Sequence, residues 1–120
     1  MSFVFVPVGG MTDPSGNFVS ISTYQGQPAT SGTNKLVAGQ AGKSIYVISY
    51  ALQATGTVTA QLKDSGGNGL SPAWTFQARE GISRPSIPGG YLFMTAVSTD
   101  LNLNLGGAVG VNVEIQYVIF

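Results

Sequence analysis

The segment VNVEIQYVI at residues 111–119 alternates between apolar and polar side chains. Successive side chains of a β-strand point to opposite faces, so this period of two predicts a strand with one buried and one wet face. Seventeen Gly and six Pro interrupt the sequence so often that long helices have little room. The pattern therefore predicts an all-β chain. Its buried face at this strand should carry Val111, Val113, Ile115, Tyr117 and Ile119.

Two earlier segments have the same character. TVTAQLK at 57–63 is predicted to point Val58, Ala60 and Leu62 inward. KSIYVISYALQA at 43–54 is long and rich in β-branched and aromatic residues, which favour strands. Its predicted core face consists of Tyr46, Ile48, Tyr50 and Leu52. The Thr55-Gly56 step between the two segments indicates a hairpin.

Further strands are expected wherever short apolar runs lie between turn-forming clusters such as DSGGNG at 64–69. Many short strands with turns every 8–12 residues or so are typical of a sandwich or barrel. We therefore predict a single domain over 1–120, an antiparallel, jelly-roll-like β-sandwich with an extended N-terminal arm. LNLNL at 101–105 is one of its strands, and weaker strands are expected at 18–23, 34–38, 73–78 and 91–97.

The N-terminal segment SFVFVPV is apolar on both faces. Pro7 argues against a central strand, because proline cannot donate to the ladder. We interpret residues 1–10 as an arm that completes its burial on a neighbouring chain, with Phe3, Val4, Phe5 and Val6 as the contact residues. The segment lacks the positive n-region of a signal peptide, and no apolar run approaches the ~18 residues of a membrane helix. Cytoplasmic synthesis without a membrane anchor is expected.

Charge is scarce in this chain. Only 8% of its residues are charged, five of each sign, against about 25% in an ordinary soluble domain. A surface with so few charges loses the usual protection against association, which favours a protein packed in an assembly over a soluble monomer. Five scattered Lys and Arg cannot form the phosphate-tracking stripe of a nucleic-acid-binding protein.

Residues 38–44, AGQAGKS, end like a nucleotide-binding P-loop. That loop needs a glycine five residues before Gly42, where this chain has Val37, and a helix after Ser44, where it has the strand-forming IYVISYAL. The segment is predicted to be a turn that leads into a strand. Lys43 is then a surface or contact lysine.

Catalytic patterns are lacking as well. Without His or Cys, the common nucleophilic schemes cannot be built, and the five acidic residues lie mostly in turn-forming surroundings. We predict no enzyme, and no catalytic, cofactor-binding or metal-binding residues; a paired-acid hydrolase is the alternative that this disfavours. A sugar-stacking platform of Trp74, Tyr24 and Tyr91 is disfavoured too, against burial of Trp74 and Phe76 in the core.

The order of the motifs over residues 34–120 resembles a group of small all-β virion proteins of tailed bacteriophages. One shared element is LVA-x-x-AGK-x-I-x-V-x-SY-x-L, present here from Leu36 to Leu52. The other is LNLNL-x-x-AV, present from Leu101 to Val109 and followed by a final alternating strand. Residues 1–33 match no such pattern.

The resemblance implies a structural role on the virion. A decoration or cement protein would sit on the capsid surface, bind the major capsid protein and stabilise the shell, commonly as a homo-trimer. The alternative is a tail, baseplate or fibre component that contacts a host receptor, and a lectin-like module is a further one. We favour capsid decoration, because a compact domain with an apolar arm suits a lattice clamp that adds a strand to a capsid-protein sheet.

Overall fold

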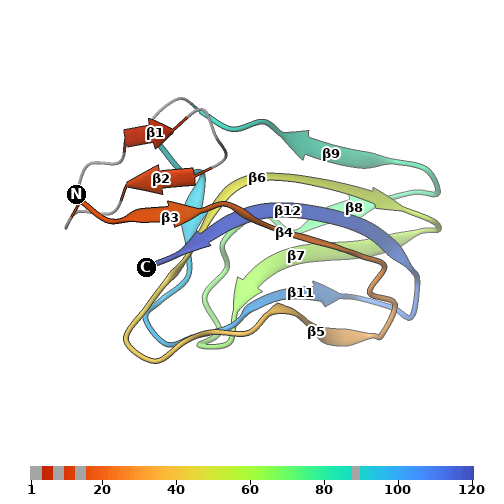
Figure 1. Cartoon of the computed structure of the whole chain (residues 1–120). Coiled ribbons are helices and arrows are strands. Elements are labelled where there is room, and N and C mark those ends of the chain that lie inside the picture. The colour runs from red at the N-terminus through yellow and green to blue at the C-terminus, as the bar shows by residue number, and fades with distance from the viewer. Residues whose placement is uncertain (1–3, 7–9, 13–15, 88–89) are drawn as a thin grey trace.

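The computed structural model describes residues 4–6, 10–12, 16–87 and 90–120. Within these ranges the chain forms twelve strands and no helix, and every strand pairing is antiparallel. The strands make two larger sheets packed face to face and one small sheet at an end (Figure 1). The predicted all-β antiparallel sandwich is confirmed. No helix of the described part is long and apolar enough to span a membrane.

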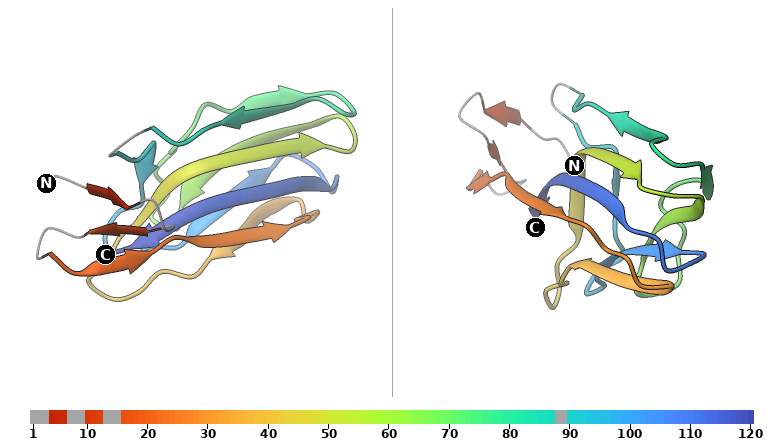
Figure 2. Two further views of the ribbon diagram at one scale, coloured as in Figure 1. Left: turned by 45° about the horizontal axis from the view of Figure 1, so that its top comes forward. Right: turned by 90° about the vertical axis from the view of Figure 1, so that its right-hand side faces the viewer.

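The five-stranded sheet has the order β10-β6-β12-β4, and β9 pairs with β6 beside β10. Its members are β4 (Ser22–Gly26), β6 (Ile45–Ala54), β9 (Gly81–Arg84), β10 (Phe93–Met94) and β12 (Val111–Ile119). The four-stranded sheet has the order β5-β11-β7-β8. Its members are β5 (Gly32–Val37), β7 (Val58–Asp64), β8 (Trp74–Phe76) and β11 (Leu101–Leu105). Figure 2 shows the two layers from two sides.

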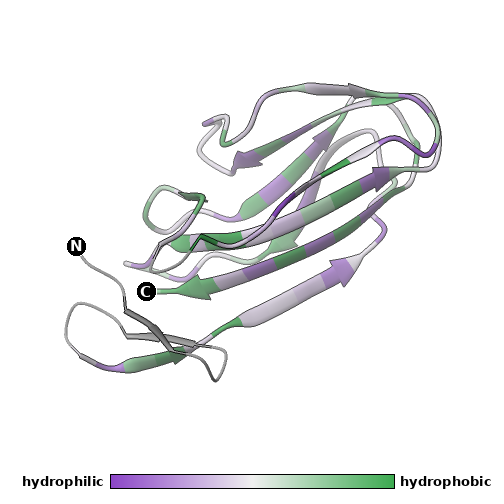
Figure 3. Cartoon of the chain, turned by 90° about the horizontal axis from the view of Figure 1, so that it is seen from above, coloured by the Kyte–Doolittle hydropathy of each residue, from purple (hydrophilic) through white to green (hydrophobic). Residues whose placement is uncertain are grey.

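The main core lies between the two sheets and is built by period-two alternation. β11 contributes Leu101, Leu103 and Leu105, each no more than 1% exposed. The predicted inward residues Val58, Ala60 and Leu62 of β7 are buried in the same cluster. Figure 3 shows the alternation as green and purple bands along the long strands. Strands β11 and β12 have the bounds that the alternation predicts.

The predicted core face of β6 is wrong in its first half. Tyr50 and Leu52 lie in the core between the sheets, but Tyr46 and Ile48 lie in a second buried cluster on the other side of the sheet. The pairing register with β12 shifts between Gln116 and Tyr117, which leaves Ile48 as an extra residue in β6. Such a β-bulge reverses the alternation, so residues before and after it face opposite ways.

The predicted hairpin at Thr55-Gly56 is also wrong. β6 and β7 belong to different sheets, so residues 55–57 carry the chain across the sandwich. Thr55 donates its amide and its hydroxyl to the Gly110 carbonyl, which fixes this crossing beside the start of β12. The turn predicted at 64–69 is confirmed, because a bridge joins Lys63 to Gly69 on the way from β7 to β8.

The N-terminal segment forms the small sheet, in the order β1-β2-β3. Its members are β1 (Val4–Val6), β2 (Gly10–Thr12) and β3 (Phe18–Ser20). β3 runs on into β4 and contacts β12, which attaches the small sheet to one end of the sandwich (Figure 1). The jelly-roll connectivity and the role of this segment as an arm stay predictions.

Candidate functional site

The end of the sandwich that carries the small sheet is the first candidate surface. Its outermost strand is β1, which pairs with β2 along one edge only among the described residues. An edge strand presents unpaired N–H and C=O groups to which another strand can add. Of the predicted contact residues, Val4, Phe5 and Val6 form β1. Phe3 lies outside the described residues.

A second apolar cluster lies beneath this end, on the outer side of the five-stranded sheet. Tyr46, Ile48 and Val118 are its buried members, and Val19 and Ile21 from the β3–β4 run pack against them. The ring of Tyr46 also meets those of two neighbours, edge-on to Tyr91 at 5.0 Å between centroids and tilted to Phe120 at 5.2 Å. The small sheet is therefore joined to the sandwich by packed side chains.

The same end carries the large apolar side chains that the described part leaves exposed. Met94 in β10, which pairs with the first residues of β6, is 39% exposed, and Val97 just after it is 59% exposed. Phe18 in β3 is 50% exposed, and Ile87, on the way from β9 to β10, is 48% exposed. Burial of such side chains against a partner would be favourable by about 25 cal/mol per Å². We call these four residues the apolar end patch.

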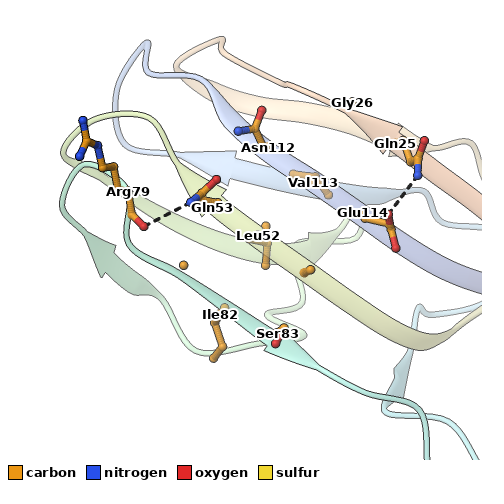
Figure 4. Close-up of a pocket in the computed structure, with 12 residues that line it drawn as sticks. Gln25, Gly26, Leu52, Gln53, Arg79, Ile82, Ser83, Asn112, Val113 and Glu114 are labelled. Atoms are coloured by element: carbon orange, nitrogen blue, oxygen red, sulfur yellow. Dashed lines mark hydrogen bonds between the residues drawn. The ribbon is translucent and has the colours of Figure 1, made fainter.

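The second candidate surface is a groove on the outer face of the five-stranded sheet, with a volume of about 540 Å³ (Figure 4). Its polar side chains come from β4, β6, β9 and β12 and from the turn before β9; they are Gln25, Gln53, Arg79, Ser83, Asn112 and Glu114. We call it the amide groove. Gln25 donates to Glu114 at 3.0 Å, and Gln53 reaches the Arg79 carbonyl at 3.5 Å. Arg79 has a φ of 71°, an uncommon conformation for a non-glycine residue, and its amide donates to the Ala54 carbonyl at 2.8 Å.

The third candidate surface is a hollow of about 420 Å³ on the outer face of the four-stranded sheet. Its floor follows β11, and its walls come from β5, β7 and the turn after β7. The lining is Thr33, Lys35, Lys63, Asp64, Ser65, Gly67, Asp100, Asn102 and Asn104. We call it the polar trough. It gathers four of the ten charged residues of a charge-poor chain, two of each sign.

Two carboxylates fix the end of the polar trough. Asp100 accepts the Gly39 amide at 2.7 Å and pairs with Lys35 at 3.4 Å. The hydrogen bond from Gly39 and the Lys35 charge lower the Asp100 pKa, against the effect of partial burial. Asp64 is buried and accepts amides from Gly66, Asn68 and Ala96. Burial alone would raise the Asp64 pKa, but these hydrogen bonds and the Asn68 side chain together lower it.

The AGQAGKS segment is a connector between the two sheets, from the end of β5 to the start of β6. Gly39 lies so close to the Thr99 carbonyl that a Cβ would collide with it. Gly42 has a φ of 75° and donates its amide to the Ser98 hydroxyl at 2.8 Å. Lys43 is exposed, and the next element is a strand. The segment packs on the loop before β11, in agreement with the predicted turn.

The three aromatic residues considered for a sugar platform lie apart. Trp74 packs against Phe76 and Tyr50 at the main core, with ring centroids 5.9 Å and 5.8 Å away. Tyr24 packs against that core from β4, and Tyr91 packs against the second cluster. The prediction that Trp74 and Phe76 belong to the core is confirmed.

Each described acidic residue is engaged within the fold. Glu80 accepts the Gln77 amide at 2.6 Å, Glu114 accepts Gln25, and Asp64 and Asp100 are held as stated above. Asp13 lies outside the described residues. The described part brings no three His, Cys, Asp or Glu residues together in a metal-binding arrangement. The groups that these surfaces present are amides, hydroxyls, ammonium groups and exposed apolar side chains.

Comparison with known proteins gives little that bears on function. No protein-family model and no curated protein matches the chain. Among solved structures, the enzymatically active domain of tailspike protein 4 from bacteriophage CBA120 is similar at 15% identity over 84% of this chain. The TM-score is 0.25, and the chain spans 17% of that structure's length. A likeness this low carries no argument about what this protein does.

Sequence reasoning missed Asn102 as a site residue. The LNLNL alternation assigns its side chain to the wet face, and the structure places it on that face but only 6% exposed. The positions of the lysines could have indicated this polar surface. In a chain with three lysines, Lys35 and Lys63 both fall in or beside predicted strands, where a lysine needs a solvent-facing position.

Proposed function

We propose that the protein is a non-enzymatic structural protein of a tailed-bacteriophage virion that decorates the capsid. It binds the major capsid protein and stabilises the shell from the capsid surface. The proposal rests on one observation. The edge strand β1 and the apolar end patch lie at the same end of the molecule. The resemblance of residues 34–120 to small virion proteins supports the same role.

Strand addition is the contact that β1 offers. Along the edge that pairs with no described strand, its main-chain N–H and C=O groups can pair with an extended segment of a capsid protein, whatever that segment's sequence. The three residues of β1 supply too few hydrogen bonds for a stable complex by themselves. The partner must also cover apolar surface, and the end patch supplies it.

The apolar end patch is the second part of the contact. Phe18 and Val97 are half or more exposed, which leaves much apolar area to be removed from water. Interfaces of this kind exclude charge from their centres, and none of the four patch residues is charged. A homo-trimer on the lattice, as the resemblance implies, would repeat this contact three times and raise the overall avidity.

The experiment mixes purified protein with phage heads emptied of DNA and measures the bound fraction by sedimentation. Deletion of residues 1–8 removes β1 but no strand of either larger sheet, so the truncated chain should fold. We expect it to lose binding while its thermal unfolding stays cooperative. Full occupancy of heads by the truncated protein would refute the role of β1.

A substitution pair tests the apolar end patch. Val97→Lys places a charge in the patch, whereas Thr57→Lys places the same charge on an exposed position at the opposite end of β6. We expect Val97→Lys to weaken binding to heads and Thr57→Lys to leave it unchanged. If the unmodified protein binds host cells and no heads, the tail or fibre alternative replaces capsid decoration.

A further inference from the structure

We propose that the polar trough binds a saccharide, whose hydroxyl groups bond the buried amide of Asn102 and the ammonium of Lys63. This site lies on the four-stranded sheet, away from β1, and it does not depend on the capsid role. The argument rests on one unsatisfied buried atom, on two flanking lysines and on the composition of the lining.

Asn102 is the central observation. Its side chain is 6% exposed and lines the trough from the floor strand β11. Its Oδ1 atom is buried and has no hydrogen-bond partner within the described protein. Most buried polar atoms of native proteins are satisfied, and one left without any partner costs about 1–3 kcal/mol in general. A ligand that donates a hydrogen bond to Oδ1 recovers this energy.

One lysine lies on each side of Asn102. In the pairing registers Asn102 lies opposite Lys35 of β5 and opposite Lys63 of β7, so the three side chains share one face. Neighbouring strands are about 4.8 Å apart, which puts the two lysine backbones about 10 Å from each other. The Lys35 ammonium already pairs with Asp100. No ion pair or hydrogen bond joins the Lys63 ammonium to another described residue.

A bulge in β5 sets up this row. The register between β5 and β11 shifts at Leu101, so Leu36 and Val37 both turn into the core and Lys35 comes opposite Asn102. Without the extra residue, Asn102 would face Leu36. Bulges often re-aim a side chain next to a functional site. The row is therefore held by strand pairing and is formed before any ligand arrives.

The class of ligand follows from what the trough offers. The ligand must donate to Asn102 Oδ1 and accept from Lys63, and a hydroxyl group does both. A simple anion has no proton for Oδ1. A metal cation would meet two lysines, and both carboxylates are engaged in the fold.

The lining also disfavours a peptide. It contains no apolar or aromatic side chain, so it offers no pocket for the anchors on which peptide binding depends. Its two lysines and two aspartates cancel in charge, which suits a neutral ligand. Its volume of about 420 Å³ is within the range of small-ligand sites. A compact saccharide meets all of these conditions.

The test is an NMR titration of the full-length, ¹⁵N-labelled protein with glucose, galactose, N-acetylglucosamine and glucuronate. Acetate serves as an anion without hydroxyl groups. We expect at least one saccharide, in the millimolar range, to shift the side-chain amide signals of Asn102 and Asn104. Acetate should not shift them. Thermal unfolding with and without the active saccharide provides a second readout, because a ligand of the folded state raises the melting temperature.

Two variants and two matched controls separate binding from folding. Asn102→Ala and Lys63→Ala should each weaken binding about tenfold, the effect of one lost hydrogen bond in such a site. Neither should destabilise the free protein by much, because Asn102 Oδ1 and the Lys63 ammonium have no partner among the described residues. Lys43→Ala and Asn112→Ala, at exposed positions outside the trough, should leave binding unchanged.

Three outcomes would overturn the proposal. One is the absence of any shift at Asn102 with all four saccharides. Another is a shift of equal size with acetate, which would make the trough an anion site. The third is loss of stability in free Asn102→Ala with unchanged saccharide binding, which would give Asn102 a purely structural role.

Discussion

At the scale of single residues, Asp64 joins two segments of the chain. Its carboxylate accepts amides from the turn after β7 and from Ala96, which lies in the loop from β10 to β11. Loss of this carboxylate would leave several donors unpaired at a site that is 3% exposed. Asp64→Ala should therefore lower the free energy of unfolding by about 2–3 kcal/mol, as measured by urea denaturation.

The pH dependence of stability should report the same carboxylate. The Asp64 pKa is lower in the folded protein than its ordinary value, so the folded state favours the charged form. This stabilisation is complete above the unfolded pKa of about 3.9 and is lost as the pH falls through the lower folded pKa. The Asp100 pKa is also lowered in the folded protein, so its contribution to stability is lost over the same direction of pH change. Urea denaturation measures the free energy of unfolding at each pH. Between neutral pH and about pH 3, we expect this free energy to fall less for Asp64→Asn than for the unmodified protein. An equal fall in both proteins would contradict the lowered Asp64 pKa.

Gly42 is the residue of the AGQAGKS connector whose conformation demands glycine. Its φ of 75° is strained for any residue with a Cβ, although no atom lies near where that Cβ would be. Gly42→Ala should cost about 1 kcal/mol in thermal unfolding, through backbone strain alone. The matched control is Gly107→Ala, at a glycine with open space and no positive φ. Equal effects of both changes would show that the Gly42 conformation costs nothing.

At the scale of elements, the bulge in β6 determines which side chains are buried and where. Ile48 is fully buried on the side of the sheet opposite to the main core, and the next residue, Ser49, is only partly buried. Ile48→Ala should lower the free energy of unfolding by about 2–4 kcal/mol, as for other large-to-small core changes. Ser49→Ala removes only the hydrogen bond from the Ser49 hydroxyl to Gln116 and should lower it by about 1 kcal/mol. If Ile48→Ala changed the free energy of unfolding by only about 0.5 kcal/mol, as surface substitutions do, the second cluster would not pack as described.

The elements also show how far the sequence predicts this fold. Alternation located β11 and β12 because each keeps a period of two over five residues or more. It misjudged the start of β6, because both faces there are apolar and only the pairing with β12 reveals the bulge. β9 was missed, since GISR is short and follows a turn. The hairpin error has a similar origin, because a short connection does not say whether its strands share a sheet.

The candidate sites were less predictable than the strands. The apolar N-terminal segment drew attention to β1 through its composition alone. The apolar end patch could not be predicted, because β3, β10 and the segments before and after β10 meet at one end only through strand pairing and packing. The polar trough depends on the two registers that bring Lys35 and Lys63 to Asn102. Such long-range juxtapositions leave no periodic trace in the sequence.

At the scale of the whole molecule, the scarcity of charge determines how association should respond to salt. The formal net charge is zero, and the patch residues Phe18, Ile87, Met94 and Val97 are uncharged. Contacts of this kind are stabilised by apolar burial and main-chain hydrogen bonds, and ionic strength screens neither strongly. Electrostatic steering, which raises association rates at low salt, should contribute little.

We therefore expect binding to emptied phage heads to change less than about threefold between 50 mM and 500 mM salt, where the Debye length falls from roughly 14 Å to 4 Å. Sedimentation at a fixed protein concentration measures this directly, and a basic DNA-binding protein that coats free DNA is the control that must lose affinity steeply. A loss of tenfold or more for this chain would show that ion pairs carry the contact. The six charged residues of the amide groove and the polar trough, Lys35, Lys63, Asp64, Arg79, Asp100 and Glu114, would then be the first to substitute.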